Sequence, residues 1–288
     1  MKKSLIALAF GTLALGIAEF VMMGILPDIA SDLHVSIAEA GHLISAYALG
    51  VCVGAPMLIL ARKHPLKRIL LVLVAVIMAG NVCAALAPNF WTLMAARFVS
   101  GLPHGAYFGV GSIAAEKLAD KGKDSEAVSI MIAGMTIANL LGVPLGTALS
   151  SMLSWRVTFL LVGCWGMIVL YYIWRWIPPV ENLPDTGFRG QFRFLRSPAP
   201  WLLIFATMLG NGGVFCWYSY VSPMLVHVSG FSPDRLTLLM ILAGFGMVVG
   251  NLTGGRLSDR FTPGRVAAVS QGSIFVILLL LFFTAHTA

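Results

Sequence analysis

Charge is scarce in this sequence: Asp, Glu, Lys and Arg make up only 11% of the residues, while 58% are apolar. A typical soluble domain carries charge on about a quarter of its residues, because its surface faces water. The apolar residues also form long runs, such as 69–87 and 157–173, and about 20 residues of helix cross a bilayer. The composition excludes an ordinary water-soluble domain and predicts an all-α integral membrane protein.

Other missing patterns exclude further classes of protein. The sequence lacks the alternation of apolar and polar residues that is typical of membrane β-barrels. It has no paired histidines, nucleophile elbow or phosphate-binding loop, so we expect neither an enzyme nor a cofactor. Its four cysteines stand singly in apolar runs, without the spacing of a metal or redox site. They are Cys52, Cys83, Cys164 and Cys216.

Apolar runs separated by Pro, Gly and clusters of charge predict nine membrane-spanning helices. They lie near residues 4–26, 39–61, 67–88, 91–113, 127–149, 155–177, 201–223, 235–257 and 264–285. The first run follows Lys2 and Lys3, as a signal peptide would, but it is longer than a typical signal core. We therefore expect it to be retained as the first helix.

The basic residues sort to one side of the membrane when these nine helices alternate in direction. Of the 19 Lys and Arg residues, 16 fall on the side of the N-terminus, and the exceptions are Arg97, Arg156 and Arg235. Basic residues of inner-membrane proteins stay on the cytoplasmic side. This predicts a multi-pass protein of the bacterial inner membrane with a cytoplasmic N-terminus. The same distribution explains the net charge of +7, so we expect no nucleic-acid partner.

The chain divides into two unequal parts that repeat one another. Residues 178–200, rich in proline and arginine, form a cytoplasmic linker between a six-helix half (1–177) and three further helices (201–288). At an offset of 196, the first part matches the second in pairs: Pro27 and Pro223, Ser36 and Ser232, Gly50 and Gly246, Gly54 and Gly250. Parallel repeats of this kind are a common plan of membrane transporters. A complete second copy would need three more helices, so we expect a polypeptide truncated after its ninth helix.

Several motifs resemble those of the major facilitator superfamily, over the whole length of the chain. Residues 254–260 are similar to the loop motif between helices 8 and 9, and residues 61–68 keep the basic residues of its first-half counterpart without the acidic one. Residues 97–105 resemble the helix 4 motif with its membrane arginine, and residues 139–146 the Gly–Pro motif of antiporter helix 5. The resemblance implies a major facilitator-type helical bundle.

Residues 16–20 and 197–201 resemble the drug:H⁺ antiporter branch in particular. This implies a secondary active transporter that exports a small organic solute, a sugar or a drug-like molecule, by alternating access. Its expected partners are that solute, protons and the lipid bilayer, its energy source is the proton gradient, and it is expected to be monomeric. A transport-incompetent fragment of such a transporter is the alternative, and uptake rather than efflux stays open.

Glu19 and Arg97 are the charged residues that fall well inside predicted spans. A charge within lipid costs about 2.5–3.5 kcal/mol on insertion scales, so it faces a cavity and a partner. Because the first helix runs outward and the fourth inward, both residues lie in the outer half of the membrane, about 6–8 Å from its midplane. We expect them to interact and Glu19 to exchange a proton, with a static ion pair as the alternative. His104, on the same helical face as Arg97, is a further proton-coupling candidate that ranks below Glu19.

Polar and aromatic side chains within apolar helices are candidates for the substrate path, or alternatively for interhelical hydrogen bonds. They are Tyr47, Asn139, Asn211, Trp217 and Tyr218. The residues expected to serve conformational change come from the motifs above. They are Gly101, Gly105, Gly142, Pro144, Gly146, Gly255, Asp259 and Arg260. Asp259 beside Arg260 predicts a latch between helix ends, with a solvated loop as the alternative.

Overall fold

A computed structural model of the chain describes residues 2–61, 63–121, 123–180, 196–232 and 235–285, and within these residues it contains helices and no strand. The helices of the N-terminal half are α1 (Lys2–Asp32), α2 (Ile37–Ala61), α3 (Leu66–Ala85), α4 (Phe90–Lys117), α5 (Asp124–Ile137), the π-helix η1 (Ala138–Gly142), α6 (Val143–Met152) and α7 (Trp155–Trp176). Those that follow are α9 (Pro198–Ser219), α10 (Val221–Pro223), the π-helix η3 (Met224–Val228), α11 (Leu236–Arg260) and α12 (Pro263–Ala285). The all-α membrane fold is confirmed.

Each predicted span coincides with a helix or with a succession of helices. Among the described residues, seven helical segments are long and apolar enough to cross a membrane. The two predicted spans without such a segment are α4, which carries Arg97 and His104, and α11, whose apolar part Leu236–Gly250 is shorter. The predicted fifth span is a composite, because α5, η1 and α6 follow one another without a break.

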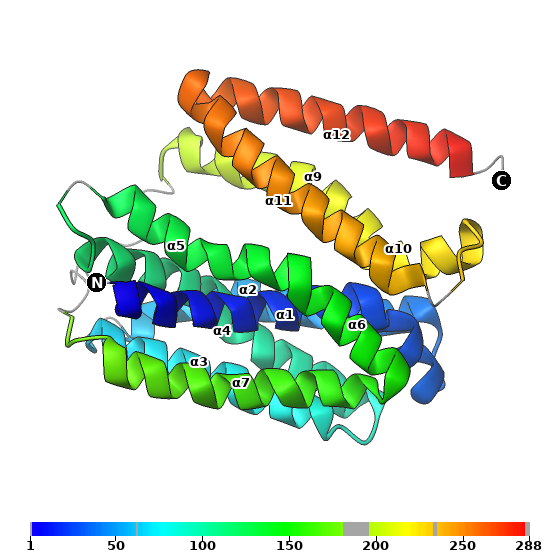
Figure 1. The fold of residues 1–288 in the computed structure, drawn as a ribbon, viewed down its shortest axis with the longest axis horizontal. Coiled ribbons are helices and arrows are strands. Elements are labelled where there is room, and N and C mark those ends of the chain that lie inside the picture. The colour runs from blue at the N-terminus through cyan, green and yellow to red at the C-terminus, as the bar shows by residue number, and fades with distance from the viewer. Residues whose placement is uncertain (1, 62, 122, 181–195, 233–234, 286–288) are drawn as a thin grey trace.

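The helices of the N-terminal half run side by side, with α1 in the middle of the bundle (Figure 1). The N-terminus, the α2–α3 connection, the α4–α5 connection and the α11–α12 connection all lie at one end, on the left in Figure 1. We call this the basic end, because the predicted cytoplasmic Lys and Arg residues cluster in these segments. Their common location agrees with the alternating direction of the nine predicted spans.

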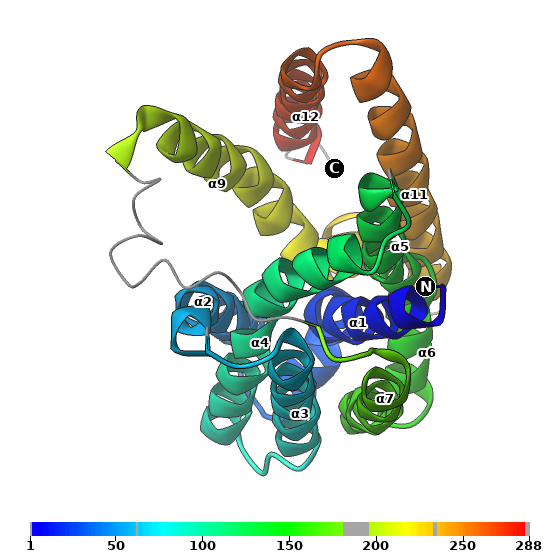
Figure 2. The same ribbon diagram turned by 90° about the vertical axis from the view of Figure 1, so that its left-hand side faces the viewer.

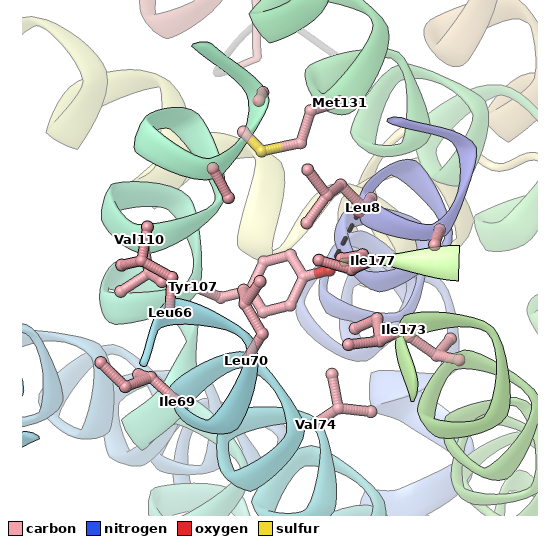
Figure 3. Packing of buried hydrophobic residues seen from close by; sticks show 14 of the residues in the cluster. Leu8, Leu66, Ile69, Leu70, Val74, Tyr107, Val110, Met131, Ile173 and Ile177 are labelled. Atoms are coloured by element: carbon pink, nitrogen blue, oxygen red, sulfur yellow. Dashed lines mark hydrogen bonds between the residues drawn. The ribbon is translucent and has the colours of Figure 1, made fainter. Parts of the chain in front are cut away.

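A buried cluster packs α1, α3, α4 and α7 together toward the basic end (Figure 3). Tyr107 of α4 is fully buried, and its hydroxyl donates a hydrogen bond of 3.1 Å to the carbonyl oxygen of Leu8 in α1. Leu70 and Val74 of α3 and Ile173 of α7 complete the apolar surroundings. A buried hydroxyl needs such a partner, since an unpaired one costs about 1–3 kcal/mol. The bond therefore fixes α4 against α1.

The predicted repeat reappears in the helix bounds. Shifted by 196, α1 covers residues 198–228, which are the combined length of α9, α10 and η3. The glycine pairs differ in their surroundings, however. A Cβ atom at Gly54 would meet the backbone of Leu102 in α4, whereas a Cβ atom at the equivalent Gly250 would meet nothing within 4 Å. The close approach of α2 to α4 thus has no counterpart at α11 within the described residues.

The two parts of the chain meet at the end of the bundle opposite the basic end. Phe20 of α1 stacks on Phe215 of α9, with 5.8 Å between ring centroids. Leu236 and Met240 of α11 join the same buried cluster. Toward the basic end the two parts separate: α12 packs against α11, and the end-on view in Figure 2 shows α9 and α12 standing apart from α1–α7. The printed contacts between the two parts are therefore found away from the basic end.

Candidate functional site

A polar network lies inside the N-terminal bundle, where α1, α2 and α4 meet. Glu19 of α1 places its carboxylate oxygen Oε2 3.7 Å from Nε2 of His104 in α4. Nδ1 of His104 shares a hydrogen bond of 2.8 Å with the hydroxyl of Tyr47 in α2. The Glu19 side chain keeps 20% exposure and that of His104 11%. The network thus joins three helices, and the Glu19 and His104 side chains keep a small exposed fraction.

Arg97 adjoins this network without pairing with the Glu19 carboxylate. Its Nη1 donates a hydrogen bond of 2.7 Å to the carbonyl oxygen of Ala18, the residue before Glu19. The guanidinium lies over the Tyr47 ring, 4.4 Å from its centroid, and 5.5 Å from that of Phe159. Glu19 and Arg97 thus lie at a common depth and interact electrostatically, as expected, while the partner nearest to the carboxylate is His104.

Arg97 also carries donors that the described residues leave unpaired. It is fully buried, and neither Nε nor Nη2 has a hydrogen-bond partner. Each buried unsatisfied donor costs about 1–3 kcal/mol, and more when it is charged. Such groups in native proteins are explained by an unseen water or ion, or by a functional role. The guanidinium therefore provides fixed positive charge and free donors beside Glu19.

Close helix packing explains how α4 reaches this position. A Cβ atom at Gly101 would collide with the carbonyl oxygen of Tyr47, so only glycine permits this approach of α4 to α2. Gly105, one turn further, faces Ala55 and Val51 of α2. Gly101 lies between Arg97 and His104 on one face of α4, so both side chains point toward the region where α4 meets α2.

The predicted helix 5 motif forms a π-helical turn. The amide of Val143 donates to the carbonyl of Ala138, five residues back, at the end of η1. Pro144 has no amide hydrogen to offer the preceding turn, which favours this wider arrangement. Gly142 and Gly146 lie against Ile17 and Val21 of α1. The interrupted segment therefore packs directly on α1, on either side of the level of Glu19.

Buried polar atoms without partners occur on α9, α10 and η1, three segments that each contact α1. Among the described residues, these atoms include Asn139 Oδ1, Trp217 Nε1, Tyr218 OH and Ser222 Oγ. The Tyr218 ring lies 6.4 Å from that of Phe20. Asn139, Trp217 and Tyr218 were predicted for the substrate path, and the fourth predicted residue of this region, Asn211, is instead exposed on α9. Tyr47 belongs to the His104 network.

Some predicted positions lie outside the described residues. These are the side chain of Asp259, the surroundings of Gly255 and most of the predicted linker, residues 181–195. Arg260 is described and exposed, with its guanidinium 5.8 Å from the centroid of the Phe261 ring. The predicted latch at this loop stays a prediction.

Three polar contacts that the sequence analysis did not single out hold the far end of α1. Asp32 pairs with Arg156 of α7 and accepts a 3.1 Å hydrogen bond from Trp155 Nε1, while Asp28 accepts one from Ser150 of α6. In the sequence, the signal for Arg156 was that it is one of the three basic residues outside the predicted cytoplasmic segments.

No group of three or more His, Cys, Asp or Glu residues that could hold a metal ion occurs in the described part of the chain.

Comparison with known proteins supports the same fold. A family model described as Major Facilitator Superfamily matches residues 8–288. A solved structure of a bacterial homologue of the human lysosomal transporter Spinster, in an inward-facing and unoccupied conformation, superposes with a TM-score of 0.70 at 21% identity. The superposition covers 90% of this chain and 63% of that one. The chain thus spans less than two thirds of that structure.

Curated relatives share the sequence along nearly the whole chain. AraJ of Escherichia coli (strain K12), named as a transporter, is 50% identical over 284 residues, which cover 98% of this chain and 72% of AraJ. A chloramphenicol resistance protein of Streptomyces lividans is 32% identical over 281 residues, which cover 96% of this chain and 71% of that protein.

Proposed function

Since this chain belongs to the Major Facilitator Superfamily, we propose that it exports a small organic solute in exchange for protons by alternating access. The observation that carries the proposal is the Glu19 carboxylate, 3.7 Å from His104 Nε2 within the bundle. Ionisable residues inside a membrane are costly and mark proton relays and substrate pathways. The proton gradient is the energy source in this proposal, which needs no cofactor.

Proton exchange takes place on Glu19 in this proposal. When Glu19 is ionised, an N–H at His104 Nε2 facing the carboxylate is favoured, and Nδ1 then accepts from the Tyr47 hydroxyl. When Glu19 takes up a proton, its attraction to both His104 and Arg97 weakens. The charge of Glu19 is thus coupled to contacts that join α1 with α2 and α4. A proton bound at this carboxylate is able to bias the packing of those helices.

The solute binds between the two parts of the chain, next to the interrupted helix 5. Aromatic rings of Trp217 and Tyr218 supply flat apolar surface, and the unpaired polar atoms there supply hydrogen-bonding groups. Ligand sites typically combine mainly apolar walls with a few polar anchors. A sugar or a drug-like molecule fits that combination, and relatives of this chain are named for probable sugar efflux and for chloramphenicol resistance.

In this proposal, the conformation described is the one open toward the basic end. The parts of the chain meet at the opposite end, where Gly244 of α11 lies against the backbone of Asn139 and Gly41 of α2 against Tyr220. If the basic segments are cytoplasmic, as the distribution of Lys and Arg indicates, this state faces the cytoplasm. Rocking of one part about the other would then expose the site to the outside.

Accumulation of solutes in cells tests the proposed export. Cells that produce the full chain are loaded with labelled chloramphenicol or with single labelled sugars, with and without a protonophore. We expect lower accumulation of at least one solute, restored by the protonophore and by Glu19→Gln. Normal accumulation of every solute, with the protein present in the membrane at normal levels, would contradict the proposal.

A further inference from the structure

A cavity lies between α2, α3 and α4, and its lining includes none of the residues of the Glu19 network. Its volume is about 460 Å³. Leu102 and Pro103 of α4 line it together with Met57 of α2 and Val72 of α3, and its lining is apolar except at one end. We call it the α2–α4 groove.

The position of the groove places it in one leaflet of the bilayer. His64 and Arg68 line it where α2 and α3 connect, at the basic end. From Arg68 to Val76, the deepest lining residue of α3, the helix rises about 12 Å, and one leaflet of the hydrocarbon core is about 15 Å thick. Met57 and Val72 keep 48% and 56% of their surface exposed. The groove is therefore open at the surface of the described bundle.

The polar end of the groove is positively charged. The Arg68 side chain is exposed and makes no hydrogen bond or ion pair with any described residue, whereas the neighbouring Lys67 donates to the carbonyl of Trp174 at 2.7 Å. The sequence contains no Asp or Glu between Glu39 and Glu116, a range that includes the whole lining. Helix α3 also begins without a side-chain hydrogen bond at its N-cap, Pro65. Its N-terminal end adds positive potential beside Arg68.

We propose that the α2–α4 groove binds one phospholipid with a net negative headgroup, taken from the leaflet at the basic end. Arg68 binds the headgroup phosphate and His64 lies beside it, while an acyl chain lies along Val72 and Val76. Basic pockets between membrane helices on the cytoplasmic side suit anionic headgroups. A soluble phosphate would leave the apolar length of the groove unfilled, and a neutral phospholipid would leave the positive end without a net counter-charge.

Native mass spectrometry of the delipidated full chain tests this proposal. Phosphatidylglycerol and phosphatidylcholine with identical acyl chains are added in turn, and the fraction of protein that retains one lipid is measured. We expect phosphatidylglycerol to be retained preferentially, and Arg68→Gln to weaken its apparent affinity about fivefold to tenfold. Arg175→Gln, at an exposed arginine of α7 outside the groove, is the matched control and should leave it unchanged.

A variant that blocks the apolar part tests the placement of the acyl chain. Val72→Trp fills the groove and should lower phosphatidylglycerol retention, whereas Val269→Trp, at an exposed valine of α12, should not. Both valines are exposed, so the two variants are expected to fold alike. Equal retention of both lipids, or retention that neither Arg68→Gln nor Val72→Trp changes, would overturn the proposal.

Discussion

The carboxylate of Glu19 and the imidazole of His104 face one another across the N-terminal bundle, with 3.7 Å between Oε2 and Nε2. The sequence suggested Arg97 as the partner of Glu19 and His104 as a further proton-coupling candidate, and the structure places His104 nearest to the carboxylate. Arg97 holds the backbone of α1 through Ala18, while His104 meets the ionisable group itself. The two basic residues therefore have different roles, which substitutions can separate.

Tyr47→Phe removes the hydroxyl that shares a 2.8 Å hydrogen bond with His104 Nδ1 and keeps the ring under Arg97. A hydrogen bond of this kind contributes about 1 kcal/mol, so we expect proton-driven export to fall roughly fivefold. Initial rates of solute efflux from loaded vesicles measure the effect. Tyr171→Phe, at an exposed tyrosine of α7, is the control, and equal rates for the two variants would argue against a role of the Tyr47 hydroxyl.

Arg97→Lys should destabilise the fold. Lysine keeps the charge but loses the planar group that lies over Tyr47 while binding the Ala18 carbonyl. We expect a loss of about 2 kcal/mol in the free energy of unfolding, in the range for hydrogen bonds to charged groups. Thermal unfolding in detergent is the measurement. Arg175→Lys, at an exposed site, should stay within about 0.5 kcal/mol of the original chain, and an equal shift for both would contradict this assignment.

The repeat supplies a matched pair of glycine substitutions. Gly54→Ala places a Cβ atom against the backbone of Leu102, so we expect destabilisation of about 1–3 kcal/mol from overpacking. The equivalent Gly250→Ala meets open space and should be neutral or stabilising by about 0.5–1 kcal/mol, because alanine favours helix. Unfolding temperatures of the two variants, measured in the same detergent, test this predicted difference in stability. Similar losses at both positions would contradict the difference in packing.

Pro144→Ala tests the π-helical turn of helix 5. An amide hydrogen at position 144 would offer the carbonyl of Leu140 its ordinary donor, so we expect a regular helix that is at least as stable. If the π-helical turn is needed for the conformational change of transport, export should slow while the unfolding temperature is not lowered. Pro56→Ala, in the uninterrupted helix α2, controls for the loss of a proline. Undiminished export by Pro144→Ala would show that the turn is only structural.

Hydropathy and charge predicted the helices and their directions because the length of each span and the alternation of direction follow from the order of residues along the chain. The rise per residue likewise placed Glu19 and Arg97 at one depth. Contacts also depend on rotation about each helix axis and on how closely helices approach, which a single sequence does not specify. Gly101 brings α4 against Tyr47 and so turns His104 toward Glu19. For the same reason Asn211 and Tyr218, on one predicted helix, lie respectively at the surface and in the interior.

Proton movement coupled to solute, measured with and without the Glu19 carboxylate, tests the proposed mechanism most directly. The full chain and Glu19→Gln are reconstituted in liposomes that contain a pH-sensitive dye, with Glu116→Gln, at an exposed carboxylate of α4, as the control. We predict that a solute exported in cells moves protons through the original chain and through Glu116→Gln, and that Glu19→Gln binds the solute but moves no protons. Solute-dependent proton movement that persists at full rate in Glu19→Gln would contradict proton exchange at this residue.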